Sequence, residues 1–205
     1  MLTKDIQSFF KAVRAGDVEK VSALIQNDKA YVTVCSVSPP KKDEGQSALQ
    51  VALKAGNFAV ARLLIEEGAD VDFVETSTTN EWRIPVLHDA IRATIFSSYT
   101  LQKDSSHFDD AFAVLALLLS RKANVHATDS FGNNSLHRAI LDSRQMINSP
   151  DADLENGVLL QQLRSVFKVL IAAGADKELA NEKRPSAKEL IENFRMEQYH
   201  LIDDV

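Results

Sequence analysis

The chain has 205 residues, of which 45% are hydrophobic and 25% charged, as in an ordinary globular domain. The formal net charge of −6 argues against a nucleic-acid partner, because phosphate binding needs clustered Lys and Arg and this sequence has only short basic pairs. The single cysteine, Cys35, excludes an internal disulfide and fits a reducing compartment. No stretch reaches the roughly 18 apolar residues of a membrane span, and the N-terminus lacks the apolar core of a signal peptide. We therefore expect no membrane partner and a cytoplasmic setting, from which the sequence does not separate the nucleus.

The first predicted unit is a pair of helices over residues 4–26, with a turn at Gly16-Asp17 between them. Apolar residues recur at helical spacing through both halves of this segment. Residues 27–44 depart from the helical pattern. Their stretch YVTVCSV, which begins at Tyr31, alternates β-branched residues with others and predicts a short extended segment.

Residues 45–72 read as one complete helix–turn–helix unit. Ser47 is a good N-cap for a first helix, and Gly56 can adopt the left-handed conformation that ends it. Apolar residues from Phe58 to Ile65 then repeat at three- and four-residue spacing, which predicts a second amphipathic helix that ends at Gly68. Neither helix can bury its apolar face alone, so each needs neighbours.

This unit resembles the ankyrin repeat. The residues that match the family pattern are Gly45, Ser47-Ala48-Leu49, Ala52, Gly56-Asn57, Val60, Leu63-Leu64 and Gly68-Ala69-Asp70-Val71. The sequence departs from the family at Ala48 and Gln50, where the family prefers Pro and His. The resemblance implies a stack of such units, because each repeat buries its apolar face only against its neighbours.

The unit recurs along the chain at intervals longer than the family period of about 33 residues. Residues aligned with Leu49 are Phe9, Leu87 and Leu136, and residues aligned with Leu64 are Leu24, Leu118 and Leu170. The excess places insertions near 31–44, 73–84, 94–109 and 142–161. The last two fall between the helices of their own repeats, so we expect them to lengthen those helices and to form a ledge on one edge of the stack.

We therefore predict an all-α repeat solenoid, an ankyrin stack of helix–turn–helix units with hairpin fingers. It forms a single domain over residues 1–194, followed by a frayed C-terminal tail over 195–205. The repeats are expected at 4–36, 45–77, 83–128 and 130–178, with a truncated cap at 180–194.

The helix expected over 110–122 is strongly apolar and should be the most buried element, with Leu117 in the core. Lys122 follows this helix where the other repeats have glycine. A left-handed lysine costs on the order of 1 kcal/mol, so we expect this helix to close differently.

The sequence contains no pattern typical of a catalytic or metal site. His88 and His137 fall at the family's histidine position, and the resemblance implies that such a histidine bonds backbone groups between adjacent repeats. His107, His126 and His200 have no companions at the spacing of zinc ligands. There is no Gly-rich phosphate loop, no Gly-x-Ser-x-Gly elbow and no Cys–His arrangement. We expect no enzyme activity, no cofactor and no metal.

The resemblance implies a binding module whose concave surface is made by the hairpin fingers and the first helix of each repeat. We expect a small adaptor or inhibitor that binds a partner protein whose identity the sequence does not give. The candidate partner contacts lie along the fingers and are Tyr31, Phe73, Glu81, Trp82, Arg83 and Phe131. For Phe73 and Trp82 an alternative stays equally open, in which both rings fold back onto neighbouring hairpins.

Two other functions fit the same fold. In the first, the stack is structural or self-associating and uses the ledge as a homodimer face, although we expect a monomer. That face needs six exposed residues, which are Ile95, Phe96, Tyr99, Phe108, Ile147 and Leu154. In the second, the chain is a pathogen or phage effector that mimics host ankyrin proteins.

Overall fold

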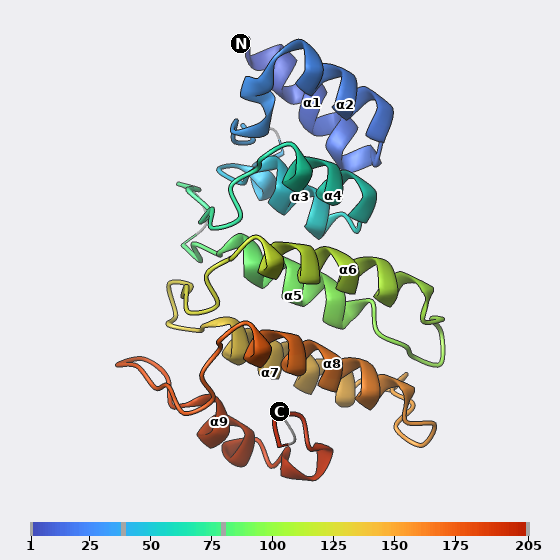
Figure 1. Ribbon diagram of the computed structural model, residues 1–205, viewed down its shortest axis with the longest axis vertical. Helices are drawn as coiled ribbons and strands as arrows, with labels where there is room; N and C mark the ends of the chain where they lie inside the picture. Colours follow the sequence, from blue (N-terminus) through green and yellow to red (C-terminus); the bar gives the residue numbers. More distant parts are fainter. Residues whose placement is uncertain (1, 38–39, 79–80, 204–205) are drawn as a thin grey trace.

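The computed structural model describes residues 2–37, 40–78 and 81–203, and in them the helices stack in layers from the N-terminus to the C-terminus (Figure 1). Four layers are pairs of antiparallel helices and the last has α9 alone. The inner helices are α1 (Thr3–Ala15), α3 (Ala48–Lys54), α5 (Val86–Phe96), α7 (Ser135–Ile147) and α9 (Ala187–Asn193). The outer helices are α2 (Val18–Asn27), α4 (Phe58–Glu66), α6 (Ser106–Ser120) and α8 (Val158–Ala172). The predicted all-α repeat stack is confirmed.

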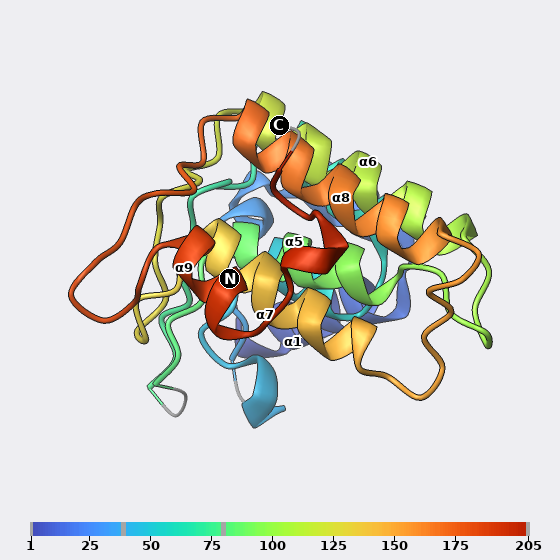
Figure 2. The ribbon, with the colours of Figure 1, turned by 90° about the horizontal axis from the view of Figure 1, so that it is seen from below.

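Irregular segments, which we call the fingers, precede the inner helices α3, α5, α7 and α9. Isolated β-bridges stiffen three of them, between Cys35 and Ser47, Val74 and Pro85, and Asn181 and Arg184. The fingers lie on one side of the stack, and the loops that join the long helices lie on the opposite side (Figure 2). A partner that covers the fingers would therefore leave those loops free.

The segment predicted to be extended begins as a short 3-10 helix instead, over Lys29–Val32. The Asp28 side chain caps this turn by accepting a hydrogen bond from the backbone N–H of Ala30 at 2.9 Å. The turn carries the side chains of Tyr31 and Val32 into the core. Local capping and burial together outweigh the extended preference of the β-branched residues.

The two large insertions lengthen the helices of their repeats, as predicted. Helices α5 and α6 have 11 and 15 residues and α7 and α8 have 13 and 15, against 7 and 9 for α3 and α4. The remainder of each insertion forms a loop, over 97–105 and 148–157. The two loops lie side by side, because Asp151 accepts hydrogen bonds at 2.9 Å from Leu101 and Gln102.

Helix α6 lies at the centre of the stack, with Leu115 and Leu118 fully buried. Leu117, predicted to be in the core, is only partly buried, because the stripe of α6 that faces α5 and α8 runs through its neighbour Leu118. The end of α6 also differs from expectation. Lys122 adopts the left-handed conformation with a φ of 67°, as Gly68 and Gly174 do after α4 and α8, so this helix closes in the same way as those two.

Over its described residues, 195–203, the C-terminal tail is packed rather than frayed; residues 204–205 lie outside the described part. The side chains of Met196, Leu201 and Ile202 are 2–4% exposed. Arg164 of α8 donates to the carbonyl of Tyr199 at 2.9 and 3.0 Å, and the Lys177 ammonium donates to the carbonyl of Ile202 at 3.2 Å. Helix α9 has no outer partner helix, and the tail, with a 3-10 turn at Glu197–Tyr199, covers the end of the stack in its place.

Candidate functional site

An aromatic pair stands on two adjacent fingers. The rings of Trp82 and Phe131 meet edge to face with their centroids 5.1 Å apart, and each residue is 44% exposed. The backbone holds the two fingers together, since the N–H of Ser130 donates to the carbonyl of Trp82 at 3.0 Å and the Ser130 hydroxyl donates to the carbonyl of Glu81. We call Trp82 and Phe131 the finger pair. The ring of Trp82 does fold onto the neighbouring finger, as one reading expected, and it is still half exposed, so its role as a partner contact stays a prediction.

The finger that precedes α9 contacts the backbone at Phe131. Arg184 donates to the carbonyl of Phe131 at 3.0 Å, and the Lys183 ammonium donates to the carbonyl of Ser130 at 2.9 Å. Gly132 permits this approach, because a Cβ at its φ of 80° would lie 2.7 Å from the Cβ of Lys183. Three successive fingers thus form one connected surface that fixes the position of the exposed rings.

The other predicted finger residues have different surroundings. Glu81 and Arg83 are exposed beside the finger pair, and Phe73 is half buried. Tyr31 is a correction, because it is only 7% exposed and its ring packs 4.7 Å from that of Phe9 between centroids. The 3-10 turn directs it into the core, so its ring is not available to a partner.

The predicted homodimer face needed six exposed residues, and the structure does not expose them. Three of its six residues, Ile95, Phe108 and Ile147, are no more than 6% exposed. Phe96, Tyr99 and Leu154 are only partly exposed. Five of the six, all but Tyr99, belong to the hydrophobic core or pack against it.

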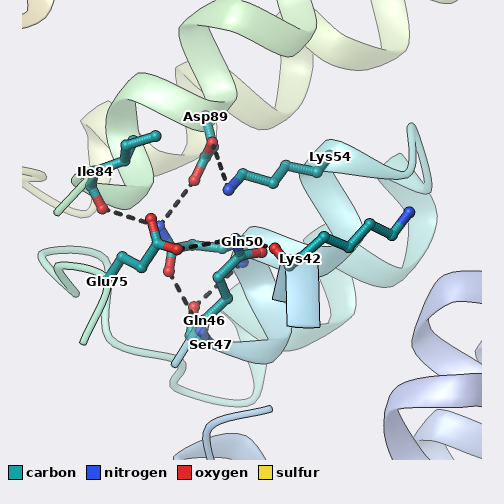
Figure 3. Close-up of polar contacts among 8 residues, drawn as sticks. All are labelled: Lys42, Gln46, Ser47, Gln50, Lys54, Glu75, Ile84 and Asp89. Carbon is teal, nitrogen blue, oxygen red and sulfur yellow. Dashed lines mark hydrogen bonds and ion pairs between the residues drawn. The ribbon is translucent and has the colours of Figure 1, made fainter. Parts of the chain in front are cut away.

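A polar network joins the second and third repeats around Gln50 (Figure 3). The Gln50 amide oxygen accepts from the backbone N–H of Ser47 at 3.3 Å, and the amide nitrogen donates to the carbonyl of Ile84 at 3.0 Å and to Asp89 at 2.8 Å. The Lys54 ammonium lies 3.7 Å from the other carboxylate oxygen of Asp89. An amide nitrogen has two donors, whereas one imidazole N–H has one. Glutamine at the family's histidine position can therefore hold both the next repeat's backbone and a buried carboxylate.

In the fourth repeat, His137 occupies the position of Gln50 and likewise links its repeat to the next one. Nδ1 of His137 accepts from the backbone N–H of Asn134 at 3.1 Å, and Nε2 lies 2.7 Å from the carbonyl oxygen of Pro185 in the next repeat. Burial lowers the pKa of His137, which keeps the ring neutral and able to do both. The expected structural role of His137 is present in the geometry.

His88 differs, because Pro85 stands at the N-cap of its helix and has no N–H to donate. Neither ring nitrogen makes a hydrogen bond of normal geometry within the described part of the chain. Burial lowers the pKa of His88 to about 4, against smaller opposing effects that include the Asp129 charge. The side chain is thus a neutral core residue between α5 and α7.

Asp89 is the most perturbed carboxyl of this surface. Burial raises its pKa to about 6, while Lys54, the Gln50 hydrogen bond and Arg92 lower it and Glu75 raises it further. A folded-state pKa above the unfolded value means that the folded state binds the proton more tightly. The stability from this group is therefore full at low pH and is lost as the pH rises through about 6.

We expect Asp89→Asn to remove this pH dependence, because the asparagine oxygen still accepts from Gln50 but does not titrate. From pH 7 to pH 5 the wild type should gain about 1 kcal/mol of unfolding free energy relative to the variant. Urea unfolding of both proteins at the two pH values measures it. The lowered pKa of His88 changes stability with pH in the opposite direction. His88 is present in both proteins, so its contribution cancels in the difference between wild type and variant. A difference that does not change with pH would contradict the raised pKa.

The described residues contain no group of three or more His, Cys, Asp and Glu side chains arranged to hold a metal ion. None of the helices they form is both long and apolar enough to cross a membrane. The features of this surface are thus exposed aromatic rings, charged side chains and buried polar joints.

Comparison with known proteins agrees with this geometry. Residues 5–95 match the family model described as ankyrin repeats in three copies. Residues 5–95 therefore consist of ankyrin repeats. The ankyrin repeat and SAM domain-containing protein 6 of Danio rerio is 35% identical over 63 residues, which is 31% of this chain and 8% of that protein. In the structure the same helix pairs continue beyond the matched residues through α5–α6 and α7–α8. Ankyrin repeats are in general protein–protein interaction modules.

Two features of this surface were not predicted from the sequence. The Asp89 carboxyl with its Gln50 partner was missed, although the departure from histidine at Gln50 was visible and marks the place. The contact of Lys183 and Arg184 with the neighbouring finger had no signal, because it depends on how two irregular segments meet.

Proposed function

We propose that this chain is a non-enzymatic adaptor or inhibitor that binds a partner protein through its fingers and inner helices, with the finger pair as the anchor. The observation that carries the proposal is the exposed pair of rings, contributed by two repeats and held by backbone hydrogen bonds. Aromatic side chains dominate binding energy at protein interfaces, and rings fixed before binding lose little entropy.

The distribution of exposed apolar residues supports the same face. Among the described residues, the large exposed hydrophobics on the fingers are Val74, Trp82, Phe131 and Leu179. The others, Leu2, Val18 and Leu101, stand apart from one another. Apolar groups that gather on one face of a soluble protein mark an interaction site, whereas scattered ones need no explanation.

We also propose a cytoplasmic setting, because the single cysteine fits a reducing compartment. We propose a monomer, because residues of the predicted homodimer face are buried.

The test is affinity capture from native lysate followed by mass spectrometry, with wild type beside the double variant Trp82→Ala/Phe131→Ala. Leu101→Ala is the matched control, because Leu101 is a 66% exposed apolar residue on the opposite side of the stack. We expect a protein that wild type and the control capture and the double variant loses. Against that purified protein, the double variant should bind roughly 30-fold more weakly, the loss of one strong anchor. Equal capture by all three baits would overturn the finger pair as the anchor.

A further inference from the structure

A row of cations runs along the inner helices of the first three repeats. Arg14, Lys54 and Arg92 each follow the aligned residues Phe9, Leu49 and Leu87 by five positions, so they occupy the same place in successive repeats. Equivalent positions of stacked repeats lie in line along the stack. We call these three residues the cation row.

The carboxylates near this row are buried beneath it. Arg14 lies 2.8 Å from Asp43 and Lys54 lies 3.7 Å from Asp89, and the two carboxylates are 8% and 2% exposed. The cationic side chains above them are 27% and 33% exposed. Arg92 is exposed and belongs to none of the ion pairs among the described residues. The exposed ends of the row are therefore cationic, whereas the carboxylates paired with Arg14 and Lys54 are covered.

A depression of about 370 Å³ lies between Lys54 and Arg92. Its lining includes the half-buried rings of Phe58 and Phe96, and the Arg92 guanidinium lies 5.2 Å from the centroid of the Phe96 ring. An apolar side chain placed in this depression would contact the two aromatic rings, with a cationic side chain on either side of it. Its lining runs from the end of α3 and the turn at Ala55-Gly56 to the C-terminal end of α5.

We propose that the partner segment bound here is an extended acidic peptide whose carboxylates pair with the cation row. Packed helices lie about 8–10 Å apart, and a chain in the extended polyproline II conformation advances about 3.1 Å per residue and turns once in three residues, so successive carboxylates should be about three residues apart. An apolar side chain between two of them fills the depression. The inference rests on the proposed function and names the chemistry of the partner.

A protein segment fits this surface better than a nucleic acid. The cation row is short, two of its members are partly neutralised by Asp43 and Asp89, and the remaining charge of the chain repels a polyanion.

The experiment is selection of phage-displayed random peptides of about a dozen residues against the folded full chain. The test variant is Lys54→Gln/Arg92→Glu. The control is Lys168→Gln/Arg62→Glu, which makes the same change of charge at exposed positions of the outer helices. Arg92→Glu alone is a second test variant, because Arg92 has no paired carboxylate and its replacement leaves the Lys54–Asp89 joint intact. Thermal unfolding of each variant establishes that it is folded.

Wild type and the control should select peptides with Asp or Glu about three residues apart around an apolar residue. Both test variants should bind those peptides about tenfold more weakly or worse, because like charges then face each other. Peptides without acidic enrichment, or equal binding by test and control variants, would overturn the proposal. Binding of a single-stranded oligonucleotide at physiological salt that Arg92→Glu abolishes would also overturn it, in favour of a nucleic acid. Peptides that need the finger pair but no carboxylate would leave the proposed function standing and remove only this inference.

Discussion

Leu118→Ala is expected to lower the free energy of unfolding by about 2–5 kcal/mol, because it opens a cavity in the centre of the stack. Leu118 is fully buried on α6, where α5, α4 and α8 pack around that helix. Each repeat of such a stack is stabilised by its neighbours, so loosening the third repeat weakens its contacts on both sides. Urea unfolding followed by circular dichroism measures the loss.

Leu117→Ala is the matched comparison, since the same side chain is removed one position away. Leu117 is partly exposed, so its loss should be clearly smaller than that at Leu118. Equal losses at the two positions, or a loss at Leu118 under about 1 kcal/mol, would contradict the burial described for α6.

The double variant Leu201→Ala/Ile202→Ala should cost about 2–5 kcal/mol for each side chain removed. Both residues are almost fully buried, and with Met196 they cover the end of the stack beside α8. Without them the apolar surface of the last repeat that the tail covers is exposed to water. Thermal and urea unfolding of the full chain measure the effect.

Glu197→Ala is the control in the same segment, because this side chain is exposed and its loss should stay within about 0.5 kcal/mol. If the double variant is as stable as this control, the tail does not cap the stack. Solubility adds a second readout, since an uncapped end should promote association.

Periodicity predicted the stack and its long helices well, because apolar residues at three- and four-residue spacing are a local signal. The repeat alignment placed Leu118 with the buried Leu64 and Leu170. Leu117, however, was wrongly assigned to the core, since an almost wholly apolar helix does not say which of its leucines face the core. The prediction of a frayed C-terminal tail was wrong for a different reason. Its three buried residues have no repeat pattern, and their burial depends on the missing outer partner of α9.

The candidate site was predicted in part. Trp82 and Phe131 stood out as aromatic residues in loops, but their mutual contact could not be read from a separation of 49 positions. Tyr31 was assigned to the same surface because its segment was expected to be extended, and the Asp28 cap turns it inward. The cation row could have been found from the repeat alignment, since Arg14, Lys54 and Arg92 align once the register is set. What alignment could not supply was the burial of their carboxylate partners.

The central claim is that fingers and inner helices form the partner-binding face. Hydrogen–deuterium exchange of the chain, alone and in complex with the partner that capture identifies, tests it most directly. We predict slower exchange on binding in the fingers at 73–78, 81–85 and 129–134 and along α5, with no change in the loops 97–105 and 148–157. Protection confined to those two loops or to the outer helices, with the fingers unchanged, would contradict the claim.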